Sequence, residues 1–313
     1  MPIRHRILAL DGGGIRGLLT AVLLRNIEAR RPGFLDQVTL FAGTSTGGLL
    51  ALGLARGLSP AELVGLYVDH GREVFQRSAW RRLTGLGTLV RARYPLDHLR
   101  RVLRGYFGEQ RLGDLDRRVL IGTFQLDADR RGVRAWKAKF FHNFSESGTG
   151  DREQEVVDVA VKTSAAPTYF PSHRGFVDGG VVAGNPSMAA LAQVLDSRIP
   201  EVERGALGDI WLLSLGTGAV HRFIAGGDHD WGQLVWALNG IVEILLDGSV
   251  GVPDFQCRQV LGESHYWRLS PAFPAGEVVP MDGVDRMDLL IRVAEQADLT
   301  PTLDWLDQSG WMT

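Results

Sequence analysis

The stretch at residues 7–19, ILALDGGGIRGLL, places a short apolar run, a glycine turn and a second apolar run in succession. Apolar residues then recur with helical spacing until Pro32, a residue type that interrupts helices. The stretch therefore predicts a strand, a tight turn and a helix. Because Gly12, Gly14 and Gly17 also fit G-x-G-x-x-G, the turn could serve a pyrophosphate or an oxyanion formed during acyl transfer.

The same order of elements recurs downstream. Residues 38–43, VTLFAG, predict a buried strand, and a glycine-rich turn leads into a predicted helix that ends near Gly57. A hairpin is expected over 118–141 with its turn at ADRR, 128–131, and another buried strand over 209–218. Strands that alternate with helices indicate an α/β fold with a mainly parallel sheet, and active groups are expected at the carboxyl ends of its strands.

Composition limits the function classes. The chain has 313 residues, is 45% hydrophobic and has a formal net charge of -2, which does not favour binding to a nucleic acid polymer. The single cysteine, Cys257, suits a reducing compartment. With no signal-type segment and no apolar run near the roughly 18 residues that span a bilayer, we expect a cytoplasmic protein that contacts membranes peripherally when active.

We expect two parts in the chain. Residues 1–225 contain the strand and helix alternation and are interpreted as the catalytic domain. Residues 226–313 are interpreted as a helical C-terminal extension packed on the same domain, with 231–248, WGQLVWALNGIVEILLDG, as its clearest helix.

The sequence GTSTG at 43–47 matches G-x-S-x-G at a predicted transition from strand to helix, the context that a nucleophile elbow requires. Ser45 is therefore the candidate nucleophile, and it needs a base to accept its proton. The best candidate is Asp178, which ends an apolar run in FVDGG. A position at a strand end would put this carboxylate on the same edge of the sheet as Ser45.

Four motifs, DGGGIRG, GTSTG, TSAAPTYFP and FVDGG, occur in the order and approximate spacing of the patatin-like phospholipases, and the chain resembles that family over roughly residues 5–220. The resemblance implies a three-layer α/β/α sandwich and a Ser-Asp dyad that cleaves glycerolipid esters without a metal or other cofactor. It also places Gly12, Gly13, Gly14 and Arg16 in the oxyanion loop.

The charge pattern agrees with an oxyanion loop rather than a dinucleotide site. Asp11 directly precedes the glycines, where its charge would oppose a pyrophosphate. The second predicted strand is followed by Ser45 and not by an acid that could bind a ribose.

Within the family, the segments GDLDRRVLIGTFQLD, AAPTYFPSHRGFVDGG and AGNPS resemble bacterial patatin effectors of cyclic-nucleotide anti-phage signalling, which implies a cyclic nucleotide activator. The chain departs from many relatives at Gly184, where they have asparagine. Two alternatives stay open: a generic carboxylesterase or acyltransferase on the same fold, and a non-catalytic lipid- or nucleotide-binding regulator. The presence of both Ser45 and Asp178 argues against the regulator.

Two further features bear on the mechanism and on membrane contact. The histidines show no metal-ligand spacing such as H-E-x-x-H, although His173, His221, His229 or His265 could in principle be the base of a Ser-His-Asp triad. The stretch 79–94, AWRRLTGLGTLVRARY, mixes apolar and arginine residues and is either a surface connection or a lid that docks on anionic membranes.

Overall fold

The computed structural model describes residues 4–76, 91–145, 150–219, 223–238 and 240–312. Its centre is a seven-stranded sheet in the order β4-β3-β2-β1-β6-β7, with β5 paired to β3 beside this path. The pairs β1–β2, β1–β6, β2–β3 and β6–β7 are parallel, whereas β4 and β5 run antiparallel to β3. The strands are β1 (His5–Leu10), β2 (Leu40–Thr44), β3 (Arg118–Arg130), β4 (Val133–His142), β5 (Phe176–Asp178), β6 (Ile210–Leu215) and β7 (Tyr266–Leu269).

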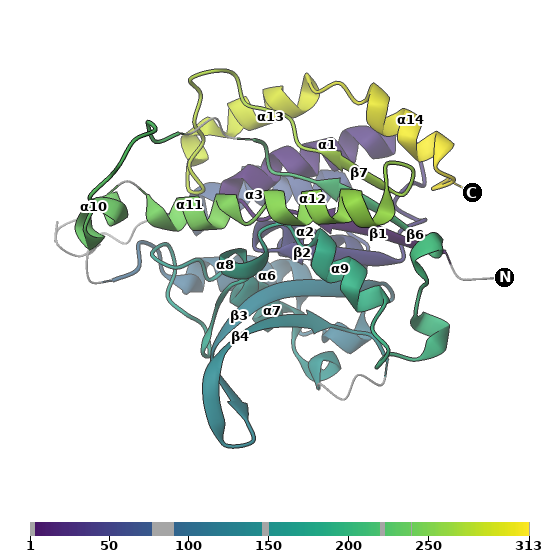
Figure 1. The fold of residues 1–313 in the computed structure, drawn as a ribbon, viewed down its shortest axis with the longest axis horizontal. Helices are drawn as coiled ribbons and strands as arrows, with labels where there is room; N and C mark the ends of the chain where they lie inside the picture. Colours follow the sequence, from purple (N-terminus) through teal and green to yellow (C-terminus); the bar gives the residue numbers. More distant parts are fainter. Residues whose placement is uncertain (1–3, 77–90, 146–149, 220–222, 239, 313) are drawn as a thin grey trace.

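Helices cover both faces of this sheet (Figure 1), which confirms the expected three-layer α/β/α fold. The α-helices are α1 (Gly17–Arg30), α2 (Thr46–Arg56), α3 (Pro60–Val74), α6 (Leu96–Phe107), α7 (Val156–Ser164), α8 (Gly180–Ala183), α9 (Ser187–Val194), α10 (Gln233–Leu238), α11 (Ile241–Gly248), α12 (Gly251–Leu261), α13 (Met287–Glu295) and α14 (Thr300–Gln308). Short 3-10 helices are η1 (Gly14–Arg16), η2 (Leu112–Asp114), η3 (Asp151–Glu153), η4 (Glu201–Glu203), η5 (Leu207–Asp209) and η6 (Val284–Arg286). Among the described residues, none of these helices has the length and apolar character to cross a membrane.

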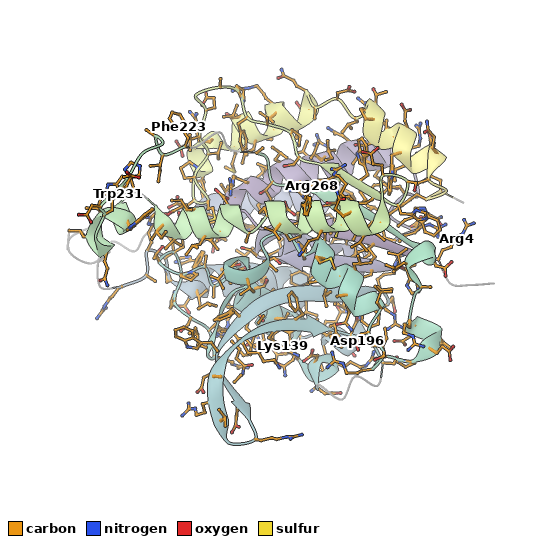
Figure 2. All side chains as sticks on the ribbon, viewed as in Figure 1. Arg4, Lys139, Asp196, Phe223, Trp231 and Arg268 are labelled. Carbon is orange, nitrogen blue, oxygen red and sulfur yellow. The ribbon has the colours of Figure 1, made fainter. Side chains whose placement is uncertain are left out.

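The part after residue 225 differs from its sequence interpretation in two ways. The single helix expected over 231–248 is divided into α10 and α11, because Gly240 adopts a positive φ of 80° that a helix cannot continue through. Moreover, β7 adds a parallel strand to the sheet beside β6, so this part is not purely helical. Phe223, which is 89% exposed, and Trp231 lie on the connection that leads into α10 (Figure 2).

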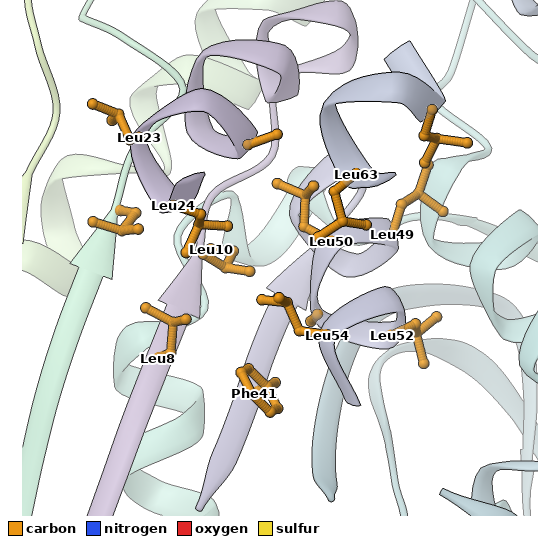
Figure 3. Packing of buried hydrophobic residues seen from close by; sticks show 14 of the residues in the cluster. Leu8, Leu10, Leu23, Leu24, Phe41, Leu49, Leu50, Leu52, Leu54 and Leu63 are labelled. Carbon is orange, nitrogen blue, oxygen red and sulfur yellow. The ribbon is translucent and has the colours of Figure 1, made fainter. Parts of the chain in front are cut away.

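The two cores follow from the alternation of side chains along a strand. In β1, Leu8 and Leu10 enter a core shared with α1, α2 and α3, whereas Ile7 and Ala9 enter the core on the opposite face, shared with α9 and α12. Figure 3 shows leucines of α1 and α2 packed over Leu8, Leu10 and Phe41. All of these β1 side chains are fully buried, so both faces of the central strand are covered. A covered sheet leaves its carboxyl edge as the place for polar chemistry.

Candidate active site

Ser45 occupies the turn between β2 and α2, as the sequence predicted. Its φ of 55° and ψ of -126° are strained for a residue with a side chain, which is typical of a nucleophile elbow. The turn is tight enough that a Cβ added at Gly47 would lie 2.1 Å from the Leu10 carbonyl oxygen. Glycine at this position therefore allows α2 to begin directly against β1.

Asp178 is the last residue of β5 and is 2% exposed. Its Oδ1 accepts a hydrogen bond of 2.7 Å from the Gly180 amide. Burial raises the pKa of Asp178 to about 7, against the lowering effect of hydrogen bonds from the Ser45 hydroxyl and the Gly180 amide. Ser45 and Asp178 also line one small pocket. The structure thus brings together the two residues that the sequence singled out.

Thr163 is a residue of the site to which the sequence assigned no role. Its hydroxyl accepts a hydrogen bond of 2.8 Å from the Ser45 amide and donates one of 2.6 Å to the Gly122 carbonyl oxygen. The side chain is fully buried near the end of α7. It therefore ties the elbow to β3. Thr163 is the first residue of the quoted motif TSAAPTYFP, but the motif gives no indication of this contact.

The backbone amides of the glycine loop after β1 are of two kinds: one is hydrogen-bonded within the protein, and two are available to a ligand. The Gly12 amide donates a hydrogen bond of 2.8 Å to the Gly184 carbonyl oxygen, so it is engaged in holding the loop. Within the described part of the chain, the amides of Gly13 and Gly14 donate to no protein acceptor. Gly13 lines the pocket of Ser45 and Asp178, and Gly14 borders Ser45 in the neighbouring cavity. These two amides are consequently the available donors in the loop.

The local structure explains why residue 184 is glycine in this chain and not the asparagine of many relatives. Its amide donates a hydrogen bond of 3.1 Å to the Ser249 hydroxyl, just after α11. A Cβ at position 184 would lie 2.6 Å from that hydroxyl oxygen. The glycine therefore accommodates the close approach of the segment that follows α11.

Arg16 supports the loop instead of pointing a free guanidinium into the pocket. It is 4% exposed, its Nε donates to the Gly13 carbonyl oxygen at 3.3 Å, and its Nη2 donates to Asp247 Oδ1 at 2.7 Å. Asp247 belongs to α11, and both it and its neighbour Leu246 line the pocket of Ser45. Asp247 could not be identified from the sequence, because no local pattern links a helix residue to a loop residue 231 positions away.

Asp11 is not a free negative charge in front of the glycines, as the sequence analysis assumed. Arg268 of β7 forms two hydrogen bonds with its carboxylate, at 3.2 and 2.5 Å, and a third with Ser214 Oγ at 2.6 Å. Figure 2 places Arg268 in the interior behind the front helices. Asp11 is 2% exposed, so the pair neutralises a buried charge. The argument from charge against a pyrophosphate is therefore weaker than the sequence suggested.

An apolar cavity opens beside Ser45. It is open to solvent, and most of its exposed lining is apolar. Its lining residues come from η1, the elbow, α2, α3, α6, the end of α7 with the segment after it, and the segment after β7: Gly14, Ile15, Ser45, Thr46, Leu49, Leu66, Tyr67, Gly71, Val74, Phe75, Leu99, Val102, Leu103, Ser164, Ala166, Tyr169, Phe170 and Met281. A long hydrocarbon chain matches a cavity of this character.

The histidines in the described residues lie elsewhere. His173 Nε2 is 2.7 Å from Asp158 Oδ1, His229 stacks on Trp231, and the ring of His265 lies 4.9 Å from that of Trp211. His221 lies outside the described residues, as do residues 79–90 of the stretch at 79–94. Over the described ranges, no cluster of three or more histidine, cysteine or acidic side chains could hold a metal ion.

Comparisons with known proteins identify the family of this chain. A family model of patatin-like phospholipases matches residues 8–191. A cGAMP-activated phospholipase of Pseudomonas aeruginosa is 34% identical over 277 residues, which cover 85% of this chain and 78% of that protein. One of Escherichia coli is 35% identical over 232 residues, which cover 68% of this chain and 62% of that protein. VipD of Legionella pneumophila, a solved structure, aligns over 93% of this chain and 67% of VipD with 12% identity and a TM-score of 0.40. The family match extends over more than half of the sequence, and the chain belongs to the patatin-like phospholipases, a family of lipid acyl hydrolases.

Proposed function

We propose that this enzyme hydrolyses fatty-acyl esters of glycerophospholipids through a dyad of Ser45 and Asp178. The observation that carries the proposal is the position of a strained serine and a buried carboxylate in one pocket at the carboxyl edge of the sheet. The pKa of Asp178, raised by burial to about 7, suits a group that must accept and return a proton near neutral pH.

In the first half of the reaction, Asp178 accepts the proton of the Ser45 hydroxyl while Oγ attacks the ester carbonyl carbon. The negative charge that develops on the carbonyl oxygen is stabilised by the amides of Gly13 and Gly14. Collapse of this intermediate breaks the bond to the lysolipid alcohol, which takes the proton from Asp178. Water, deprotonated by Asp178, then attacks the acyl-serine ester, and release of the fatty acid returns the proton to Ser45.

The apolar cavity supports a long acyl chain as the substrate group. Its lining is almost entirely hydrocarbon, and it begins at Ser45 and Thr46. Burial of each methylene of the acyl chain contributes about 0.8 kcal/mol. A long chain would therefore hold its ester at the nucleophile more firmly than a short one.

We also propose that a cyclic nucleotide activates the enzyme and that it works while bound to a membrane surface. Two relatives with 34% and 35% identity carry the name cGAMP-activated phospholipase, which supports the first part. Because its substrate would reside in a bilayer, the second part follows from the reaction. A role in defence against phage would be consistent with such activation.

The test is hydrolysis of mixed phospholipid vesicles, followed by mass analysis of the released lipids, with and without a panel of cyclic di- and trinucleotides. We expect fatty acid and lysolipid from the wild type with the correct nucleotide, and none from Ser45→Ala or Asp178→Asn. His173→Ala is the control that should retain most activity. A folded His173→Ala enzyme as inactive as Ser45→Ala would contradict the dyad, and full activity without nucleotide would contradict only the activation.

A further inference from the structure

The β3–β4 hairpin extends well beyond the body of the molecule (Figure 1). Thr123 of β3 is paired with Asp178, so β3 reaches the level of the candidate active site at this residue. The strand continues to Arg130, and the chain turns at Arg131 and Gly132. At about 3.3 Å per residue, the turn lies about 26 Å of strand beyond Thr123. The hairpin thus leaves the sheet at the carboxyl edge, where Ser45 is also found.

The turn is built to hold its shape. Arg131 and Gly132 both have positive φ values, 55° and 83°, which are the values of a two-residue hairpin turn whose twist matches its strands. The Gly132 amide also donates a hydrogen bond of 2.7 Å to Asp129 Oδ1. At the base, the Leu126 amide donates to the Gly175 carbonyl oxygen at 2.8 Å. A fixed hairpin presents its side chains without a further ordering cost.

The side chains on the hairpin are unusual for a surface that contacts only water. Trp136 is 78% exposed, Val133 is 66% exposed and Leu126 is 38% exposed. Residues 126–137, LDADRRGVRAWK, contain four basic residues and two acidic ones. Tryptophan together with arginine and lysine is the composition of segments that insert at the interface of an anionic bilayer.

We propose that the β3–β4 hairpin is a docking element that inserts Trp136 and Val133 into the interface of an anionic phospholipid bilayer. The inference rests on the proposed function, because that function places the substrate in a bilayer, and it names a surface distinct from residues 79–94. A second copy of the chain fits the hairpin less well. Lys137 lies on the edge strand β4, and such a charge repels an identical strand while it attracts lipid phosphates, whereas Arg134 is already paired with Asp127.

The experiment measures binding separately from catalysis. The protein, in the Ser45→Ala background, is sedimented with two kinds of vesicle. One contains phosphatidylcholine alone, and the other also contains about 30 mol% of the anionic lipid phosphatidylglycerol. Trp136→Ala should weaken binding to the anionic vesicles about tenfold, since partial burial of a large aromatic side chain is worth about 1.4 kcal/mol. Arg131→Glu should weaken binding to the anionic vesicles more than to the neutral ones.

Val202→Ala is the matched control, because Val202 is 72% exposed but lies in η4, which comes before β6 and thus near the amino edge of the sheet. Its vesicle binding should equal that of the parent. In the Ser45-intact enzyme, Trp136→Ala should reduce hydrolysis of vesicles but not of a soluble short-chain ester, which also shows that the variant folds. If Trp136→Ala binds vesicles as tightly as the control, or changes only the sedimentation coefficient of the free protein, the docking proposal is wrong. A wild type that binds vesicles through the hairpin but cleaves no ester would instead refute the proposed function alone.

Discussion

Replacing Asp178 by asparagine should stabilise the fold while it abolishes hydrolysis. Burial raises the pKa of this carboxyl from 3.8 to about 7. Below pH 3.8 the carboxyl is protonated in both the folded and the unfolded chain, so its titration does not affect stability. Between pH 3.8 and 7 the unfolded chain releases a proton that the folded chain keeps, and the free energy of unfolding therefore decreases as pH rises.

The magnitude follows from the size of the shift. A difference of about three pKa units corresponds to about 4 kcal/mol, all of it lost above pH 7 and about half of it already lost at pH 5.5. Asparagine removes this penalty and keeps an Oδ1 that can accept the hydrogen bond from the Gly180 amide. For a chain of this length, 1 kcal/mol changes the melting temperature by about 1.5 °C. Asp178→Asn should therefore melt about 6 °C higher than the wild type at pH 8.5 and about 3 °C higher at pH 5.5.

Thermal unfolding followed by circular dichroism at the two pH values measures this effect. Asp151→Asn is the control, because Asp151 is equally buried but lies 2.6 Å from Lys139 Nζ. Its replacement should destabilise the fold, since it leaves the lysine charge without its carboxylate. The reasoning would be refuted if Asp178→Asn melted at or below the wild-type temperature at pH 8.5, or if its advantage did not grow with pH.

Three other changes have defined outcomes. The kcat/KM for a soluble ester should rise about tenfold per pH unit below pH 7 and level off above it, because only ionised Asp178 can act as the base. A profile of kcat/KM that is flat from pH 5 to 8 would exclude this role of Asp178. Ala166→Leu should fill part of the apolar cavity and lower kcat/KM for long-chain esters at least about tenfold relative to short-chain esters. The assay compares an acyl chain of about sixteen carbons with one of about four carbons. An unchanged ratio of the two kcat/KM values would place the acyl chain elsewhere. Gly47→Ala should lower the free energy of unfolding in urea by about 1–3 kcal/mol and remove most of the activity, because the new Cβ would clash with the Leu10 carbonyl oxygen. Gly105→Ala in α6 is the control. Its Cβ would meet nothing within 4 Å, so the change should be neutral or stabilising.

The parts of the molecule that local sequence encodes were predictable. The stretch SPAE at 59–62 encodes a capping box, and the structure has it at the start of α3, where the Ser59 amide donates to Glu62 Oε2 at 2.8 Å. The strands β1, β2 and β6 and the helices after the two glycine turns are also where periodicity placed them. The hairpin was predicted as well, but its turn lies at Arg131 and Gly132 and not across 128–131. Each of these features depends on residues a few positions apart.

The remaining parts depend on contacts between distant segments. No periodic pattern identifies β7, a strand of four residues at the sheet edge. The ion pairs of Arg16 with Asp247 and of Asp11 with Arg268 join residues more than 200 positions apart. The same holds for the hydrogen bond of Ser45 with Thr163, which are 118 positions apart. Local propensity contains no information about such pairs, so the motifs locate the site without the residues that support it.

The ion pair of Asp11 with Arg268 can form only late in synthesis, because its two residues are far apart in the chain. A ribosome that adds about 5–20 residues per second needs about 13–50 s to travel the 257 positions between the two residues. For most of that interval the nascent chain contains Ser45, and for the later part Asp178, but its glycine loop has neither Arg268 behind it nor, until shortly before the end, Asp247 on Arg16. Because the loop is completed from the far end of the polypeptide, premature termination and proteolytic trimming from the carboxyl terminus should both yield fragments without hydrolase activity.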